Sequence, residues 1–116
     1  MNVYLAGPMR GYPQFNFPAF FKAAKKLEKQ GHKVFNPAAK DITHYGSLKK
    51  VVKEYNQNPQ KVMRDVIKKD LLWIINKAEQ IAVLPGWKKS KGVKAELALA
   101  KFLGIDIVYL SKEFLK

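Results

Sequence analysis

Two acidic side chains occupy apolar faces of expected helices, where carboxylates are uncommon. Glu96 lies three residues after Val93 and four before Ala100, so it shares the face that would pack on a sheet. Asp70 lies four residues after Val66, on the apolar stripe of the preceding helix. A carboxylate on an apolar face is costly unless it is paired or used. Two of them suit glycosidic chemistry, in which one attacks or stabilises the sugar carbon and another group assists the leaving base or orients the sugar.

Each of these residues also has a purely structural interpretation. Glu96 can be a partly exposed glutamate that bridges to a nearby lysine, and Asp70 can form a local ion pair with Lys69 or Lys77. Tyr4, at the end of the first expected strand, either donates a hydrogen bond to such a carboxylate or is a half-buried strand tyrosine. The residues alone favour neither interpretation of Tyr4.

A loop rich in glycine and proline, Gly7-Pro8-Met9-Arg10-Gly11, follows the same strand. Its glycines let backbone N–H groups approach an anion while the arginine guanidinium grips it, which indicates a possible phosphate-binding loop. The alternative is an ordinary turn with a surface arginine. The loop is not a Walker loop, because no Gly-Lys-Ser/Thr sequence follows, and it lacks the dinucleotide-binding Gly-x-Gly-x-x-Gly pattern.

The elements that must position these residues alternate between strands and helices. The strands are expected at residues 2–6, 33–35, 80–84 and 105–110. A first helix is expected after Asn16 as N-cap, and Gly31 sits where a glycine ends a helix. Further helices are expected after the start signal Asn58-Pro59 and after Ser90 as N-cap. Between residues 38 and 58, Ser47 can cap a helix through Tyr55, and the remainder is expected to be a polar loop.

Strands that alternate with helices imply parallel pairing through right-handed crossovers. We therefore expect one domain over residues 1–116, an α/β fold with a parallel sheet of four to five strands flanked by helices, flavodoxin- or Rossmann-like. Tyr4, Val83 and Ile107 should lie on strands. Ligands of such sheets bind beyond the carboxyl ends of the strands, so the loops at 7–15, 37–47 and 85–91 should converge on one rim.

Composition excludes several classes of site. Hydrophobic residues make up 47% of the chain, which is typical of a globular rather than a disordered protein. The absence of cysteine excludes disulfides, thiolate metal sites and a cysteine nucleophile, and two separated histidines, His32 and His44, do not suggest a metal centre. No apolar run is long enough for a membrane span, so the expected location is the cytoplasm. The net charge of +13 attracts polyanions, but its lysines are spread along the chain, as on a solvated surface.

Several motifs follow one another in order along nearly the whole chain. They are Tyr4-Leu5-Ala6-Gly7-Pro8-Met9, Asn16-Phe17-Pro18-Ala19-Phe20, Gly31-His32-Lys33-Val34-Phe35-Asn36-Pro37, Asp70-Leu71, Leu84-Pro85-Gly86-Trp87 and Ser90-x-Gly92-Val93-x-x-Glu96. Together they resemble the short, often phage- or prophage-encoded branch of the nucleoside 2-deoxyribosyltransferase superfamily. The spacing from the serine to the glutamate is the most specific part.

The resemblance implies an enzyme that cleaves or transfers the N-glycosidic bond of a 2′-deoxynucleoside or its 5′-monophosphate. We expect no metal or cofactor, because the carboxylate supplies the nucleophile. It implies that Glu96 is a nucleophile forming a covalent deoxyribosyl intermediate, that Tyr4 orients it and that Asp70 contacts the substrate. Ser90 and Arg10 look like the phosphate-binding residues of the related deoxynucleoside 5′-monophosphate N-glycosidases. The substrate-binding set is thus expected to comprise Gly7, Pro8, Met9, Arg10, Gly11, Ser90, Gly92 and Trp87.

Two assignments rest on residue type alone. Trp87 or Phe15 can stack the base, with core packing as the alternative for Phe15. Relatives in the family pair and complete each other's pockets, and Trp73 and Phe102 exceed what a small helical layer needs to bury. We therefore expect a homodimer or a higher oligomer.

Two other functions remain compatible with the residues. The same pocket can capture a nucleotide or a nucleotide-derived signal without turning it over, because a nucleophile and a ligand-anchoring acid look alike in sequence. The charge of +13 can instead belong to a DNA-binding protein. That interpretation is the weaker, because no recognition-helix pattern is evident and Arg10 and Arg64 are the only arginines.

Overall fold

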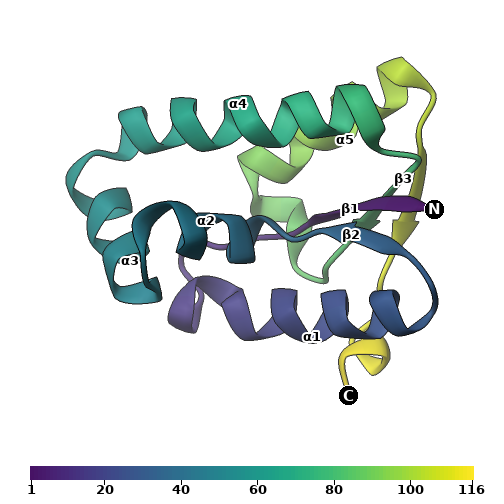
Figure 1. Ribbon diagram of the computed structural model, residues 1–116, viewed down its shortest axis with the longest axis horizontal. Helices are drawn as coiled ribbons and strands as arrows, with labels where there is room; N and C mark the ends of the chain where they lie inside the picture. The colour runs from purple at the N-terminus through teal and green to yellow at the C-terminus, as the bar shows by residue number, and fades with distance from the viewer.

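Four parallel strands form the centre of the computed structural model, which describes residues 1–116 (Figure 1). From one edge to the other they are β2 (Lys33–Phe35), β1 (Asn2–Ala6), β3 (Gln80–Val83) and β4 (Asp106–Tyr109). Tyr4 is paired with Phe35 on one side and Ile81 on the other, and Ile81 is paired with Ile107. The expected single-domain parallel α/β fold is confirmed, and its radius of gyration of 13.3 Å fits one domain of this length.

The helices cover both faces of the sheet, and the strands alternate between them. In Figure 1, α1 (Phe17–Lys29) lies below the sheet, whereas α4 (Pro59–Lys77) and α5 (Lys91–Leu103) lie above it. The side chains of Val3 and Leu5 belong to the apolar cluster of the α1 face. Those of Tyr4 and Ala6 belong to the cluster of the α4/α5 face. Because successive side chains of β1 point to opposite faces of the sheet, Tyr4 lies on the same face as α4 and α5.

Residues 37–57 form two helices at the carboxyl end of the sheet, α2 (Pro37–Tyr45) and α3 (Leu48–Gln57) (Figure 1). The expectation of a polar loop before Ser47 was wrong. Asn36 caps α2, because its side-chain oxygen accepts a hydrogen bond from the Ala38 N–H at 3.0 Å, and Pro37 occupies the first turn. Ser47 caps α3 as expected, with its hydroxyl accepting from the Lys50 N–H at 3.2 Å.

The entry to α1 differs from the expected N-cap at Asn16. Gln14, Phe15 and Asn16 all have left-handed backbone conformations, with φ of 54°, 53° and 61°. Asn16 does not cap the helix with its side chain, and its Nδ2 instead donates to the Pro8 carbonyl at 2.9 Å. The 3-10 turn η1 (Pro13–Asn16) is thereby tied back to the start of the loop. Three consecutive non-glycine residues with positive φ are strained, so tertiary contacts must hold this segment.

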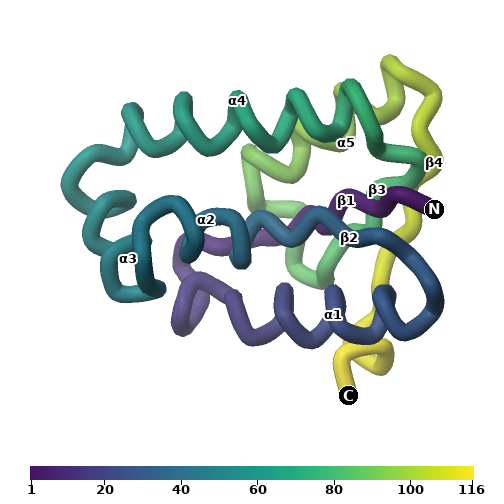
Figure 2. The backbone as a smooth tube through the Cα atoms, in the orientation of Figure 1, coloured from purple at the N-terminus to yellow at the C-terminus, as the bar shows by residue number.

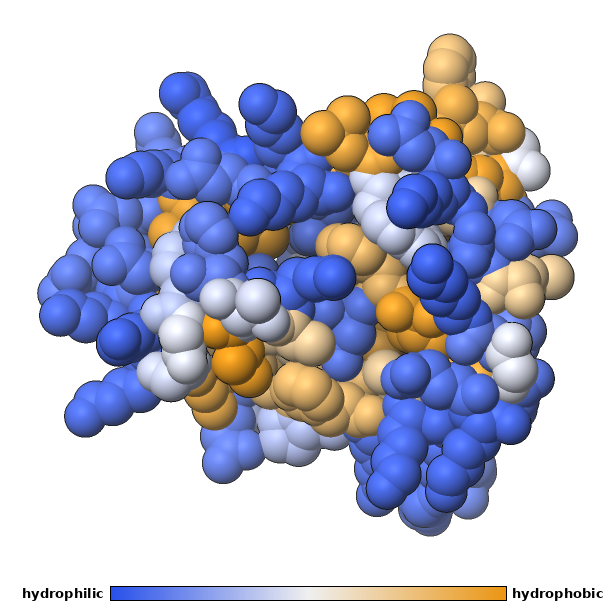
Figure 3. Space-filling model, in the orientation of Figure 1, coloured by the Kyte–Doolittle hydropathy of each residue, from blue (hydrophilic) through white to orange (hydrophobic).

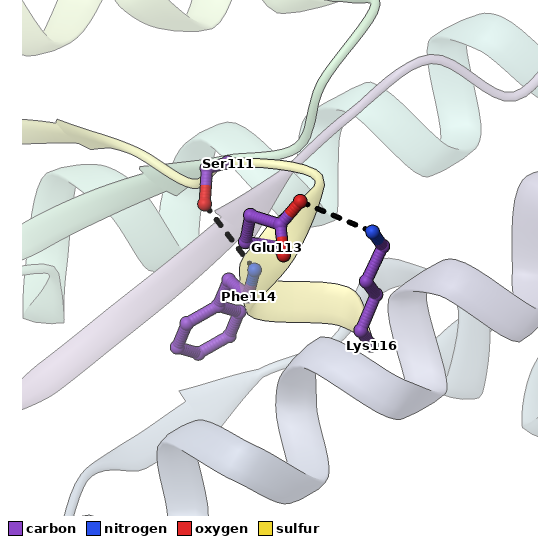
Figure 4. Close-up of polar contacts among 4 residues, drawn as sticks. All are labelled: Ser111, Glu113, Phe114 and Lys116. Atoms are coloured by element: carbon purple, nitrogen blue, oxygen red, sulfur yellow. Dashed lines mark hydrogen bonds and ion pairs between the residues drawn. The ribbon is translucent and has the colours of Figure 1, made fainter.

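The C-terminal segment folds back onto α1 (Figure 2). It ends in the 3-10 turn η3 (Glu113–Leu115), where the Ser111 hydroxyl accepts from the Phe114 N–H and Glu113 pairs with Lys116 at 3.1 Å (Figure 4). Lys26 of α1 donates to the carbonyls of Phe114 and Lys116. Among the helices of the chain, none combines the length and the apolar composition that crossing a bilayer requires.

Candidate functional site

A cavity of about 500 Å³, here called the main pocket, opens beyond the carboxyl ends of β1 and β3. These strands are neighbours, but the chain leaves them in opposite directions, from β1 to β2 at one edge and from β3 to β4 at the other. Ligands of parallel sheets bind at such a switch point. The walls are the loop after β1, the middle of α4 and the first two turns of α5, together with Pro37 and Tyr55.

Glu96 and Tyr4 meet in this pocket. The Tyr4 hydroxyl donates a hydrogen bond to Oε2 of Glu96, across the gap between β1 and α5. Tyr4 is 1% exposed, and its ring stacks on Phe35 with 5.4 Å between centroids. The interpretation of Glu96 as a glutamate bridged to a lysine is therefore wrong. Of the two interpretations of Tyr4, the structure supports the one in which its hydroxyl donates a hydrogen bond to a carboxylate.

Asp70 lines the same pocket from α4 and is buried. The expected alternative, an ion pair with Lys69 or Lys77, is wrong, because the chain's one ion pair joins Glu113 and Lys116. The Tyr4 hydroxyl also interacts with Asp70 and favours its ionised form. Sequence spacing thus correctly brought Tyr4, Asp70 and Glu96 to one site.

Burial raises the pKa of both carboxyl groups. Burial is the main reason that the pKa of Glu96 rises to about 8. The hydrogen bond from Tyr4 opposes this rise, and the charge of Asp70 adds to it. Burial likewise brings the pKa of Asp70 to about 7, against the effects of Tyr4 and Lys69. The pKa of Tyr4 is raised well above its usual range by burial and by both carboxyls, so its hydroxyl stays protonated. The carboxylate pair, Asp70 and Glu96, therefore shares its protons near neutral pH.

The main pocket also carries cationic side chains. Arg10, Lys89 and Lys91, here called the cationic rim, all line it. The Arg10 guanidinium lies over the ring of Tyr55, 5.2 Å from its centroid. Ser90 caps α5, with its hydroxyl accepting from the Val93 N–H at 3.3 Å. A helix N-terminus, a serine hydroxyl and three cations can hold an anion such as phosphate.

Two glycines allow the loops of the pocket to approach one another. A Cβ at Gly7 would lie 2.6 Å from a methyl carbon of Leu84, so the end of β1 requires glycine. Gly86 has a φ of +85°, and a Cβ there would collide with the hydroxyl of Tyr12. The loop after β1 and the loop after β3 are thus in contact, which closes the pocket between them.

The expected substrate-binding set is only partly brought together. Gly7, Pro8, Met9, Arg10, Ser90 and Gly92 line the main pocket, whereas Gly11 and Trp87 do not. Trp87, in the 3-10 turn η2 (Trp87–Lys89), packs at a tilt against Tyr109 of β4 with 5.3 Å between ring centroids, and its assignment to the base was wrong. Phe15 packs edge-on against Tyr55 at 5.3 Å and joins the α1-face cluster, which is its core-packing alternative.

Sequence reasoning missed several residues that line these cavities. Tyr55 supports Arg10, and Lys89 and Lys91 complete the cationic rim. Asp41 of α2 is buried and lines a second cavity beside Asp70. The signal that would have found Asp41 is Asn36-Pro37, the same helix start that was used at Asn58-Pro59; it places Asp41 in the second turn of a helix.

No three His, Asp or Glu side chains converge closely enough to hold a metal ion. No curated protein and no solved structure shows significant similarity to the chain. A family model described as "Domain of unknown function (DUF4406)" matches residues 1–109, nearly the whole chain, and the protein therefore belongs to this family.

Proposed function

We propose that the protein is an enzyme that cleaves or transfers the N-glycosidic bond of a 2′-deoxynucleoside or its 5′-monophosphate, with Glu96 as the nucleophile. The observation that carries the proposal is the hydrogen bond from the buried Tyr4 to Oε2 of Glu96 in a pocket that Asp70 also lines. The motif resemblance to nucleoside 2-deoxyribosyltransferases supports the same chemistry.

The arrangement of the carboxylate pair suggests one role for each member. Tyr4 occupies Oε2 of Glu96, while Oε1 accepts no hydrogen bond from the protein and is free to attack C1′ of the sugar. As the Oε1–C1′ bond forms, the C1′–N bond breaks and its electron pair passes to the base, which takes a proton from Asp70. Water or a second base then attacks C1′ and releases Glu96. Water gives hydrolysis, and a second base gives transfer.

The cationic rim suggests that the substrate carries a 5′-phosphate. Arg10, Lys89 and Lys91 line the pocket, and no carboxylate neutralises them in an ion pair. Ser90 and the free N–H groups at the start of α5 add donors in the same place. A bound phosphate would there be held by charge-assisted hydrogen bonds, which are roughly twice as strong as neutral ones.

One observation favours a second candidate, a protein that binds the nucleotide without turning it over. A pKa of about 8 leaves most Glu96 carboxyls protonated at pH 7 when the site is empty, and a protonated carboxyl is a poor nucleophile. Within the interval between pKa values of about 7 and about 8 the pair holds one proton, mostly on Glu96. The proposed enzyme acts through the minor form, in which Asp70 holds that proton and Glu96 is ionised.

We also propose that the protein is a homodimer in solution. Phe102 of α5 is 87% exposed, and Leu72 and Ile75 of α4 are also exposed. Figure 3 shows apolar surface gathered at the upper right, over the C-terminal ends of α4 and α5. A second copy of the chain would cover this surface, because large contiguous apolar patches on proteins usually mark interaction sites.

The test is incubation of the full chain with a panel of deoxynucleosides and their 5′-monophosphates, with free base detected by chromatography. We expect base release from at least one monophosphate without added metal, and base exchange when a second free base is supplied if the reaction is transfer. Tight nucleotide binding without base release would select the binding protein. Binding of duplex DNA in preference to every nucleotide would overturn both.

A further inference from the structure

A second cavity lies beside the main pocket and is here called the side pocket. Its volume is about 490 Å³, and it is lined by residues of α2 and α4, with Phe35 at the end of β2. Val66 and Asp70 line both cavities. The cationic rim belongs to the main pocket alone, whereas Asp41 belongs to the side pocket alone. Asp70 therefore stands between the main pocket with its cationic rim and a side pocket in which the acids Asp41 and Asp65 lie among Lys40, His44 and Lys69.

Asp41 is the unusual residue of the side pocket. It is 3% exposed, and its Oδ2 is buried without a hydrogen-bond partner in the protein. An unsatisfied buried polar group costs roughly 1–3 kcal/mol, and more when the group is charged. Asp41 is a lining residue of the side pocket, in which a ligand can supply the missing hydrogen. Nothing in the α2 helix itself requires an acid at this position, because Asn36 already caps it.

The surroundings of Asp41 indicate what kind of hydrogen is missing. Burial raises the pKa of Asp41 to about 7, and the charge of nearby Asp70 adds to the rise. Tyr55 and Lys69 favour the ionised form. An ionised Asp41 repels a carbonyl oxygen but accepts a hydrogen bond from an amino group, which brings two N–H donors and no acceptor. Phe35 and Val66 are the apolar residues of the side-pocket lining, and the Lys40 ammonium lies over the Phe35 ring, 5.6 Å from its centroid.

We propose that the side pocket receives the base of the substrate and that Asp41 selects an amino-bearing base, such as a 6-aminopurine or a 4-aminopyrimidine, by accepting a hydrogen bond from its exocyclic amine. The inference rests on the proposed function, because it takes the sugar to lie at the carboxylate pair. With the phosphate on the cationic rim and the sugar beside Glu96, the base extends past Asp70 into the side pocket. Asp41 is then a specificity-determining residue that takes no part in bond cleavage.

The experiment measures binding in a chain that cannot react, so that recognition is separated from turnover. The Glu96→Gln chain is titrated calorimetrically with 2′-deoxyadenosine 5′-monophosphate and with the matched purine 2′-deoxyriboside 5′-monophosphate, which has hydrogen in place of the amine. The keto analogue, 2′-deoxyinosine 5′-monophosphate, is the third ligand. We expect the amino ligand to bind about 10- to 100-fold more tightly than either analogue, the scale of a hydrogen bond to a charged acceptor.

Substitutions in the side pocket then test whether the preference for the amino ligand depends on the carboxyl group of Asp41. Adding Asp41→Ala should bring the three affinities to within about threefold of one another, since the acceptor is gone, whereas Asp41→Asn should keep part of the preference through its carbonyl oxygen. Asp65→Asn is the matched control, because Asp65 is an exposed acid that lines the same cavity. It should leave the preference unchanged. Thermal melts check folding, and Asp41→Asn should not lower the melting temperature, because it removes a buried unpartnered charge.

The possible failures are distinguishable. Equal affinities of the three ligands, a preference for the keto ligand, a preference that survives Asp41→Ala, or an equal loss in Asp65→Asn would each overturn the role of Asp41. In each of those cases, base release by the wild-type chain can still uphold the proposed function. Conversely, an amine preference that depends on Asp41 in a wild-type chain that releases no base would uphold the recognition and refute the reaction.

Discussion

The two faces of the sheet differ in what they bury. The α1 face carries a cluster of 13 buried residues that is aliphatic and aromatic throughout, with Tyr55 as its one hydroxyl-bearing member. The α4/α5 face has a smaller cluster of nine, and beside it lie the carboxyls of Asp70 and Glu96 and the hydroxyl of Tyr4. β1 contributes to both, since its alternate side chains point to opposite faces.

This difference separates stability from chemistry. Burial of apolar surface on the α1 face stabilises the fold, by roughly 25 cal/mol for each Å² removed from water. On the α4/α5 face, burial raises the pKa values of both carboxyls, which means that their ionised forms destabilise the folded chain. A fold retains such groups where function requires them. Changes on the two faces should therefore have opposite signatures.

Glu96→Gln should produce the largest effect. Glutamine keeps the size of the side chain and can still accept from Tyr4, but it is not a nucleophile, so base release should fall by on the order of 10⁴-fold or more. Substrate binding should remain. The measurement is base release by chromatography beside calorimetric binding, and a 2-fluoro-substituted deoxynucleoside or nucleotide should leave its sugar mass on the wild-type peptide that contains Glu96.

The Glu96→Gln variant should also gain unfolding free energy relative to the wild type as the pH rises. The folded pKa of about 8 lies above the ordinary value of 4.5, so the folded chain binds more protons between these pH values. The wild-type contribution of Glu96 to unfolding free energy therefore falls as pH rises through that window and is constant above it. Glutamine does not titrate, so the variant's advantage should grow from pH 4.5 to 8. Near-normal base release, or a label on Asp70, would contradict the assignment.

Asp70→Asn should remove one limb of the pH profile. In the wild type, kcat/KM should fall below pH about 7, where both carboxyls are protonated, and above pH about 8, where neither retains a proton. Asparagine cannot donate the proton, so the rate should drop by roughly 10²- to 10⁴-fold and the alkaline limb should vanish. The acid limb should then report the pKa of Glu96 alone, which falls when the Asp70 charge is removed but stays above 4.5 because burial remains its main cause. An alkaline limb that persists would show that another group is the donor.

Leu27→Ala should have the opposite signature, because Leu27 is a buried residue of α1 that lines neither pocket. The cavity left behind should lower the unfolding free energy by about 2–5 kcal/mol. Base release at temperatures well below the melting transition should stay near the wild-type rate. Denaturant unfolding beside the chromatographic assay checks both parts. A loss of turnover without a loss of stability would refute the separation between the faces.

Arg10→Ala should act on the ligand rather than on the carboxyls. If the substrate carries a 5′-phosphate, binding of the monophosphate should weaken by about 1.5–3 kcal/mol, while the free nucleoside loses little. Lys22→Ala removes the same charge from an exposed position on α1 and is the control. Calorimetry of both ligands with both variants gives the comparison. Equal losses for nucleoside and monophosphate would assign Arg10 a different role.

Local signals were sufficient to predict most of the fold. Glycine with positive φ after α1, serine caps before α3 and α5, and the apolar spacing of α4 and α5 are all visible in the residues. The carboxylate pair was predictable for the same reason, since helical spacing places Asp70 and Glu96 on inward faces. Tyr4 needed one step more, because its partner depends on which face of β1 meets α5.

The rest depends on contacts between distant segments. Asn16 carries a favourable N-cap signal, yet its left-handed backbone follows from the hydrogen bond to Pro8 across the loop. Trp87 is close in sequence to residues that line the main pocket, but its ring packs against Tyr109 of β4. Asp41 is an ordinary helical acid by sequence, and only the packing of α2 against its neighbours buries it. Burial of a polar group is therefore the property that sequence spacing predicted least well.

Phe102→Ser should have the smallest effect and concerns the outer surface of the α4/α5 face. Phe102 is 87% exposed, so the substitution removes little from the fold of one chain. In a homodimer that buries this ring, it should cost about 1.5–2 kcal/mol of association free energy, which corresponds to a roughly ten- to thirty-fold rise in the dimer Kd. Phe21→Ser, at an α1 position that is 43% exposed, is the matched control and should leave Kd unchanged. Sedimentation of the wild type should show dimers at micromolar concentration; monomers alone there, or an equal weakening by both variants, would show that the apolar surface over α4 and α5 is not where two chains meet.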